Sequence, residues 1–292
     1  MNAAQKIIDL HRPHFQHLDA LSVGVIDFKK MSFELYGDTH LFFDLASVSK
    51  VLGNGAMFLK HPSVIDEKVR LLLEHRAGLP AWGLLKKSNW KEELSAYAIK
   101  ESETLYSDYS AMRFSLEVEK KLSLKIPALL KDWWDKELYF WQDLPHTYET
   151  PISGQRGFDF ITHDVHDPNA FNLKEWTGHA GLFGNVESVC KTLLNFQDKG
   201  KLIENMLGAW NDHSQRFLYG WDRVANPQDT LAGKGCSQQT FGHLGFTGTS
   251  VWIDAQKQRG HVILSNATRD GWYQKDELNE FRRSFGEVIW QM

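Results

Sequence analysis

The stretch Ser47-Val48-Ser49-Lys50 follows the apolar run Leu41-Phe42-Phe43 and leads into the small, apolar segment Val51–Leu59. Residues three apart share one face of a helix, so the Lys50 amine can reach the Ser47 hydroxyl. A serine attacks a carbonyl only when a neighbouring group takes its proton, and a lysine one turn away can do so. The stretch predicts a serine nucleophile with its own base, held by a continuous packed helix over Val51–Leu59.

Two further Ser-x-x-Lys matches show that the bare pattern is weak, since roughly one is expected by chance in a chain of this length. Ser88 follows a pair of lysines in a polar turn and precedes Lys91. Ser188 opens an ordinary amphipathic helix that contains Lys191. We expect both serines to be structural, because only Ser47 has a rigid apolar run before it and a packed helix after it.

Composition bounds the class of protein. The 292 residues can bury a large core, and a formal net charge of −4 without a basic block argues against a nucleic-acid partner. No apolar stretch approaches the ~18 residues that span a bilayer. Neither a Gly-x-Ser-x-Gly motif nor a Walker loop is present, and no cofactor is indicated. The expected partner is a small-molecule or peptide substrate, and the oligomeric state is left open.

The N-terminal sequence and the two cysteines bear on the compartment. Met1 leads into an amphipathic segment and not into the apolar core of a signal peptide, so we expect a cytoplasmic protein. A periplasmic location is the alternative if a signal peptide has been removed from the natural sequence and Met1 is not the natural start. Cys190 and Cys236 do not resemble a disulfide framework and fit a reducing compartment.

Hydrophobic periodicity predicts an α+β fold of the α/β sandwich type. Strands are expected at both ends of the chain, and most signals between them are helical. The expected strands are Ser22–Phe28, Met31–Tyr36, Phe241–Phe246, Thr249–Asp254 and Gly260–Leu264. We therefore expect one antiparallel sheet built from residues 1–46 and 215–292 and flanked by terminal helices. A mostly helical region, residues 47–214, would be inserted, with the cleft between the two parts.

Six blocks in the same order carry a family resemblance. They resemble the serine β-lactamase and penicillin-binding protein superfamily, most closely its class C-like branch of carboxypeptidases, esterases and amidases. The blocks lie within residues 41 to 254 and are Phe43–Lys50, Leu73–Pro80, Tyr106-Ser107-Asp108, His166–Ala170, Gly178–Phe183 and Phe241–Gly248.

The resemblance implies a serine β-lactamase-like fold and a serine acyl hydrolase that works through an acyl-enzyme on an amide or ester. D-alanyl peptides and other muropeptide fragments are the implied substrates. Ser47 would attack the carbonyl, and the N–H groups of Ser47 and Phe246 would form the oxyanion hole. Tyr106 would relay protons with Lys50. No metal is implied.

Two departures from the family pattern concern the substrate and the base. Relatives that bind a carboxylate usually carry Lys-Thr-Gly where this chain has His243-Leu244-Gly245. A histidine is only about one quarter charged at pH 7, so we expect weaker carboxylate binding that improves toward pH 6. Asp108 stands where many relatives have Asn, and as a carboxylate it would raise the pKa of Lys50. A base near pH 7 instead needs a lysine pKa about three units below the usual ~10.4.

Two other hypotheses stay open. A catalytically weak relative could bind peptidoglycan fragments without cleaving them, although Ser47, Lys50 and Tyr106 are all present. A metal hydrolase could use the segment His163–Asp167, but its histidines lack the spacing of a zinc helix. We expect His75 and His179, each in a turn of small residues, to be structural.

Overall fold

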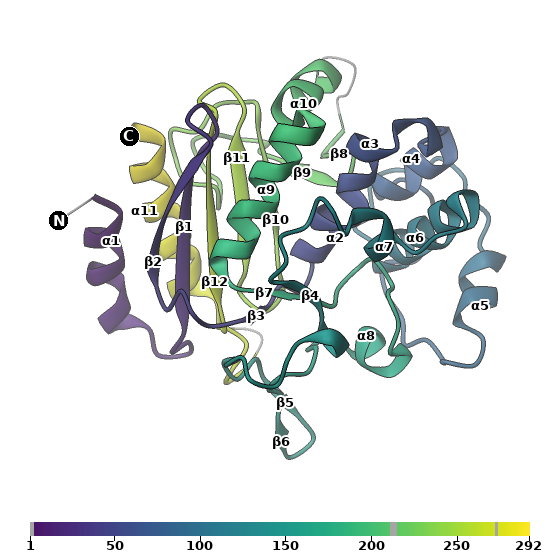
Figure 1. Cartoon of the computed structure of the whole chain (residues 1–292), viewed down its shortest axis with the longest axis horizontal. Coiled ribbons are helices and arrows are strands. Elements are labelled where there is room, and N and C mark those ends of the chain that lie inside the picture. Colours follow the sequence, from purple (N-terminus) through teal and green to yellow (C-terminus); the bar gives the residue numbers. More distant parts are fainter. Residues whose placement is uncertain (1–2, 211–214, 272–273) are drawn as a thin grey trace.

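A seven-stranded antiparallel sheet forms the centre of the computed structural model, which describes residues 3–210, 215–271 and 274–292 (Figure 1). Met1, on which the expected compartment rests, lies outside these residues. The strand order is β2-β1-β12-β11-β10-β9-β8. The bounds are β1 (Leu21–Asp27), β2 (Ser32–Gly37), β8 (Phe217–Leu218), β9 (Trp221–Arg223), β10 (Thr240–Leu244), β11 (Ser250–Asp254) and β12 (Arg259–Ser265). β1 pairs with β12, so the predicted sheet from both ends of the chain is confirmed.

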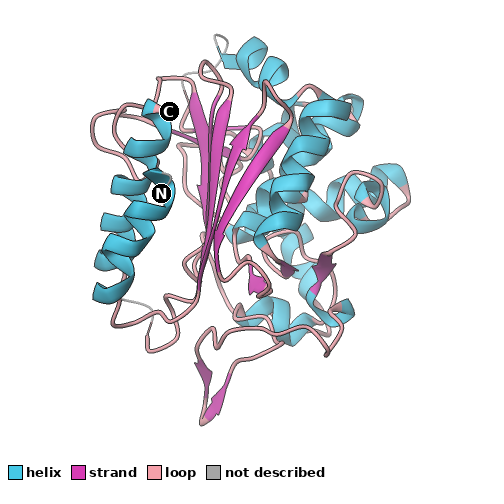
Figure 2. Ribbon diagram, turned by 60° about the vertical axis from the view of Figure 1, so that its left-hand side comes forward, coloured by secondary structure: helices cyan, strands magenta, loops and turns pink. Residues whose placement is uncertain are grey.

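Helices cover both faces of this sheet. The terminal helices α1 (Ala3–His11) and α11 (Asp276–Gln291) pack together on one face, and α9 (Val186–Gly200) lies on the other (Figure 2). α11 buries Leu278, Phe281, Phe285 and Ile289, which step by three and four along one helix face as its sequence predicts. The predicted α/β sandwich is therefore confirmed.

The helical region lies beside the sheet and carries most of the remaining elements. Its helices are α2 (Val48–Leu52), α3 (Met57–Lys60), α4 (Glu67–Leu73), α5 (Trp90–Ala96), α6 (Asp108–Leu122), α7 (Ile126–Leu130), α8 (Pro168–Leu173) and α10 (Leu202–Trp210). Two small sheets accompany them: β3 (Phe43–Asp44), β7 (Leu182–Gly184) and β4 (Leu138–Phe140), and the pair β5 (Gln155–Arg156) and β6 (Asp159–Phe160). Short 3₁₀ turns are η1 (Arg12–His14), η2 (Asn54–Ala56), η3 (Pro62–Val64) and η4 (Trp141–Asp143).

The division into residues 1–46 with 215–292 and residues 47–214 stays a prediction. All strands of the large sheet come from the first set of residues. However, α9 lies in the second set and packs against β1, β2 and β12. The two sets therefore share one interior, and the sheet is not a separate unit.

The expected continuous helix over Val51–Leu59 is wrong. α2 ends at Leu52, Gly53 leaves helical geometry, and the chain passes through η2 before α3 begins. Two tryptophans explain the break. The Trp134 indole N–H donates to the Leu52 carbonyl at 2.8 Å, and a Cβ on Gly53 would lie 2.6 Å from the Trp176 ring. A single helical turn thus carries Ser47 and Lys50, and tryptophan packing ends it.

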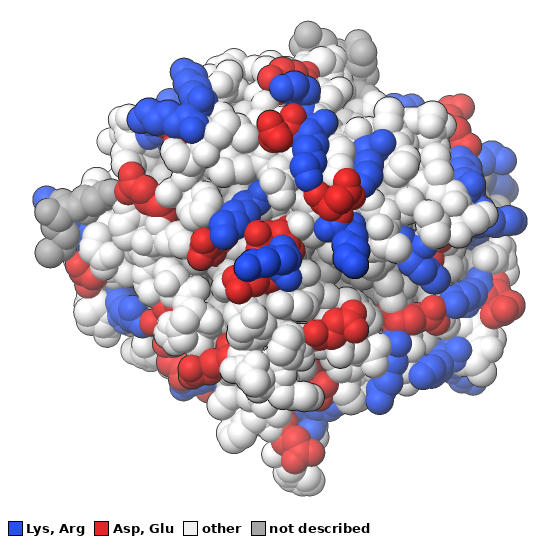
Figure 3. All heavy atoms as spheres, viewed as in Figure 1, with Lys and Arg blue, Asp and Glu red and all other residues white. Residues whose placement is uncertain are grey.

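The surface shows no large patch of one charge on the face seen in Figure 3, where acidic and basic side chains are interspersed. No helix within the described ranges is both long and apolar enough to cross a bilayer. Cys190 and Cys236 are free and buried.

Replacement of Phe285 tests how far the terminal helix stabilises the sheet. Phe285 is fully buried between α11 and the sheet, so Phe285→Ala should lower the free energy of unfolding by about 3–5 kcal/mol. The neighbouring exposed Arg283→Ala should change it by less than ~0.5 kcal/mol. Equal effects of both variants in urea unfolding would show that α11 is not part of the core.

Candidate active site

The turn before Ser47 is fixed by a buried carboxylate. Asp44 accepts hydrogen bonds from the Ala46 N–H at 2.8 Å and the His166 N–H at 2.6 Å. Ala46 has a φ of 45°, which is unusual for a residue with a Cβ and marks a sharp, strained turn. Burial raises the pKa of Asp44 to about 6. The turn places Ser47 at the N-cap of α2, half-buried at the cleft.

The end of β10 is tied to the same turn. The Thr247 hydroxyl donates to the Asp44 carbonyl at 2.7 Å, and the Thr249 hydroxyl donates to the Leu45 carbonyl at 2.9 Å. A Cβ on Gly245 would lie 1.9 Å from the Thr249 hydroxyl and 2.8 Å from the Leu45 carbonyl, so only glycine allows this approach.

Phe246 consequently lines the same two cavities as Ser47, which agrees with a shared oxyanion hole. The assignment of their N–H groups to that role stays a prediction.

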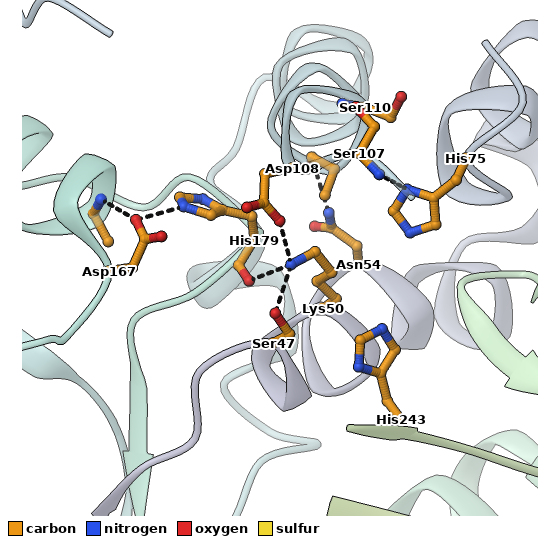
Figure 4. Close-up of polar contacts among 12 residues, drawn as sticks. Ser47, Lys50, Asn54, His75, Ser107, Asp108, Ser110, Asp167, His179 and His243 are labelled. Carbon is orange, nitrogen blue, oxygen red and sulfur yellow. Dashed lines mark hydrogen bonds and ion pairs between the residues drawn. The ribbon is translucent and has the colours of Figure 1, made fainter. Parts of the chain in front are cut away.

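Lys50 stands at the centre of the site (Figure 4). Its buried Nζ lies 2.9 Å from the Ser47 Oγ, 2.9 Å from the His179 carbonyl oxygen and 2.7 Å from the Asp108 carboxylate. The centre of the Tyr106 ring is 5.1 Å away. The structure therefore brings together Ser47, Lys50, Tyr106 and Asp108 as the sequence predicts.

The protonation of Lys50 is set by competing effects. Burial lowers the pKa of its amine, but the Asp108 carboxylate, followed by Tyr106, raises it by more. The net pKa of Lys50 lies above its ordinary value. The lowered pKa that a free lysine base requires is thus absent, and Lys50 is an ammonium that hydrogen-bonds two oxygens and forms an ion pair with Asp108. An ammonium has no lone pair with which to take the Ser47 proton.

His243 is neutral and cannot supply the positive charge of the lysine found at this strand in the family that the sequence resembles. Its Nδ1 lies 2.7 Å from the Leu244 carbonyl oxygen, which accepts only, so Nδ1 carries the proton. Burial first, and the Lys50 ammonium second, lower the pKa of His243 to about 4. The expectation that His243 gains charge toward pH 6 is therefore wrong, because its ring is buried beside a cation.

From the sequence, Asp167 was considered only as part of the metal-hydrolase alternative, and His179 was expected to be structural. Their side chains lie 2.8 Å apart, and Asp167 also caps α8 through the Ala170 N–H. Burial raises the pKa of Asp167, but the nearby His179 imidazole lowers it by more, so Asp167 is a carboxylate. Ligand atoms of Asp108, Asp167 and His179 lie within 4.8 Å of one another. The blocks that contain them were visible in the sequence, but their convergence depends on the fold.

The other histidines have structural contacts. The His163 ring lies 3.1 Å from the Thr150 hydroxyl and 2.5 Å from the Tyr148 carbonyl oxygen, so it supports its loop. His75 accepts the Ser107 N–H at 3.1 Å and thereby fixes the start of α6. Within the described residues, the group of three potential metal ligands includes Asp167 but neither histidine of His163–Asp167. The geometry does not support a metal site on that segment.

Two cavities open on either side of Ser47. The larger, about 640 Å³, has an aromatic lining that includes Trp82, Tyr106 and Phe246. The smaller, about 340 Å³, borders His243 and contains three cationic side chains that the sequence reading missed: Arg216, Lys275 and Arg282. Lys275 hydrogen-bonds the Phe246 carbonyl, and burial, together with Arg282, lowers its pKa to about 8.

The two competing serines lack this environment. Ser88 is exposed in a turn. Ser188 is buried in the first turn of α9, where its hydroxyl donates to the Asn185 carbonyl at 2.8 Å. Lys191 instead pairs with Glu187 at 2.8 Å.

Comparison with solved structures identifies the fold. A β-lactamase/D-alanine carboxypeptidase from Pseudomonas syringae covers 99% of both chains at 13% identity with a TM-score of 0.68. A class C β-lactamase from Rhodobacter sphaeroides also covers 99% of both chains at 13% identity, with a TM-score of 0.64. The chain has the serine β-lactamase fold. The resemblance drawn from the six sequence blocks is thereby confirmed for the architecture.

Sequence comparison finds relatives with related names, but each matches only part of the chain. An N-acetylmuramyl-L-alanine amidase from Bacillus subtilis is 25% identical over 199 residues, which are 56% of this chain and 44% of that protein. A candidate D-alanyl-D-alanine carboxypeptidase from Escherichia coli is 34% identical over 113 residues, 35% of this chain and 26% of that protein. The chain thus matches less than half the length of these relatives. No family model matches it.

The contacts of the three serines give a direct test of the nucleophile. Ser47→Ala should abolish turnover of an activated ester, whereas Ser88→Ala and Ser188→Ala should keep it. Lys50→Ala should lower the rate at least ~100-fold, as expected for loss of a general base. A comparable loss in either control serine variant would overturn the assignment.

The neutral His243 and the titrating Lys275 predict how acylation by penicillin varies with pH. The ratio of penicillin acylation to acylation by a neutral ester should stay constant between pH 7 and 6, where His243 carries no charge. It should fall as the pH rises through about 8, because Lys275 then loses the charge that attracts a carboxylate.

Stopped-flow measurement of both rates gives the ratio, and Lys275→Gln should remove the alkaline step. A ratio that rises toward pH 6 would restore the charged histidine.

Proposed function

We propose that this chain is a serine acyl hydrolase that cleaves an amide or ester through an acyl-enzyme on Ser47. The observation that carries the proposal is the buried Lys50 amine 2.9 Å from the Ser47 hydroxyl, at the edge of a cavity of about 640 Å³. The serine β-lactamase fold and the names of the relatives support the same reaction class.

For the substrate we propose a D-alanyl peptide or another muropeptide fragment. The relatives' names refer to muramyl-alanine and D-alanyl-D-alanine bonds, both found in such fragments. The aromatic cavity offers a surface for an acyl group, and Lys275 and Arg282 in the other cavity offer positive charge for a carboxylate. These cations offset the loss of the family's strand lysine, so carboxylate binding does not depend on His243.

A catalytically weak binder is the second candidate, and one observation favours it. The Asp108 carboxylate holds Lys50 as an ammonium, which cannot deprotonate Ser47 in this state. The candidates differ in whether Ser47 forms a covalent bond.

Covalent labelling separates them. Intact-mass spectrometry after incubation with a fluorophosphonate should show one adduct, lost in Ser47→Ala but kept in Ser188→Ala. A parallel incubation with a penicillin reports on carboxylate recognition. Absence of labelling by either reagent, with the protein folded, would favour the binder.

Dialysis against a strong chelator tests the metal alternative. The proposed reaction needs no metal, so ester turnover should be unchanged after dialysis. Loss of activity that zinc restores would support a metal hydrolase.

The cytoplasmic location expected from the sequence also remains a proposal. Fractionation of cells that express the full natural reading frame tests it.

A further inference from the structure

The contacts of Lys50 offer a route by which it can become a base. The Lys50 ammonium donates hydrogen bonds to the His179 carbonyl and the Ser47 hydroxyl, and it forms an ion pair with the Asp108 carboxylate. The carbonyl accepts a hydrogen bond but does not take the proton at neutral pH. The carboxylate does take protons, and it is the shortest of the three contacts at 2.7 Å.

We propose that Asp108 accepts a proton from Lys50 once substrate fills the cavity, which leaves Lys50 as the amine that deprotonates Ser47. This inference rests on the proposed acyl hydrolase function. It gives the Asp108 departure from the family's Asn a chemical role in this chain.

The surroundings of Asp108 favour the transfer. Its side chain is only 18% exposed and lines the larger cavity, so bound substrate removes the remaining water. In water the ordinary pKa values, about 10.4 and 3.9, favour the charged pair over the neutral one by more than a millionfold. Loss of water removes the solvation of the two charges and shifts this balance toward the neutral pair.

The neighbouring Asp167 carboxylate also favours transfer of the proton to Asp108. A ligand atom of Asp167 lies within 4.8 Å of one on Asp108, and like charges this close raise the proton affinity of one of them. The other titratable groups of the site are Tyr106, His179, His75 and His243. Both His75 and His243 are kept neutral chiefly by burial, with the Lys50 charge as the next cause, so neither competes for this proton.

The proton balance closes over one acylation. Lys50 first gives a proton to Asp108, so the pair becomes an amine and a carboxylic acid. The Ser47 oxygen then bonds to the substrate carbonyl carbon, the carbonyl π electrons move to oxygen, and the Ser47 proton passes to Lys50. When the bond to the leaving group breaks, the leaving group takes a proton from Lys50. Asp108 returns its proton to Lys50, which restores the ion pair; water repeats the steps in deacylation.

The pH dependence of acylation tests this role. The first measurement, wild type against Ser47→Ala with p-nitrophenyl acetate, establishes whether the proposed function holds at all. In wild type, the acylation rate constant should then stay within about threefold between pH 7 and 9, because an internal transfer leaves the total proton count unchanged. A rise of about tenfold per pH unit would mean that Lys50 must lose its proton to solvent, and would overturn the proposal.

The Asp108→Asn variant supplies the second measurement. It keeps a hydrogen-bond acceptor but cannot take the proton, so Lys50 must titrate with solvent. We expect the ratio of the variant rate to the wild-type rate to depend on pH between pH 5 and 9. Below the pH at which Lys50 titrates in the variant, this ratio should decrease about tenfold for each unit by which the pH is lowered. Groups such as Asp44 and Lys275 titrate in both proteins, so their effect on the rate cancels in this ratio. A constant ratio across this range would reduce Asp108 to a structural partner.

Two controls accompany this variant. Asp108→Glu keeps a carboxylate and should restore the flat profile. Asp132→Asn removes the carboxylate of the exposed ion pair with Lys60, remote from the cavity, and should match wild type at every pH. Thermal unfolding of each variant checks the fold, and if Asp108→Asn does not fold, the wild-type profile alone decides.

Discussion

The ion pair between Lys50 and Asp108 constrains the chemistry of the whole site. Desolvation of a lone lysine would leave Lys50 a neutral amine, the form that a Ser-x-x-Lys nucleophile needs. The carboxylate 2.7 Å away reverses that effect and holds the charge. That charge in turn contributes to the low pKa of His243 and of His75. The imidazoles of His243 and His75 therefore remain neutral beside the Lys50 charge, which faces the carboxylates of Asp108 and Asp167.

The geometry of this pair depends on contacts between the sheet and the helical region. The Thr249 hydroxyl fixes the Leu45 carbonyl just before the nucleophile, and Gly245 leaves room for that approach. From the other side, His75 fixes the first turn of α6 and so places Asp108. A change in the packing of either region would move one partner of the site relative to the other.

The features that could be predicted from the sequence are those that depend on residues close together along the chain. Periodicity located the hairpin and the C-terminal helix, and the flanks of Ser47 separated it from Ser188. It could not predict the break at Gly53, because the two tryptophans that cause it lie far along the chain. Nor could it assign Lys275 to the cleft, since the pattern of α11 reports its buried face only. The charge of His243 was misjudged because burial is a property of the fold.

The free energy of proton transfer from Lys50 to Asp108 can be compared with the activation barrier of a typical enzyme. In water, moving a proton from lysine to aspartate costs about 9 kcal/mol, from ordinary pKa values about 6.5 units apart. A turnover of ~10 s⁻¹ corresponds to a barrier of about 16 kcal/mol. The transfer thus fits within the barrier before any help from the protein, and both the loss of water on substrate binding and the Asp167 carboxylate would lower its cost. A strong ion pair in the resting state is therefore compatible with an active serine, because the same carboxylate that holds the proton on Lys50 can receive it.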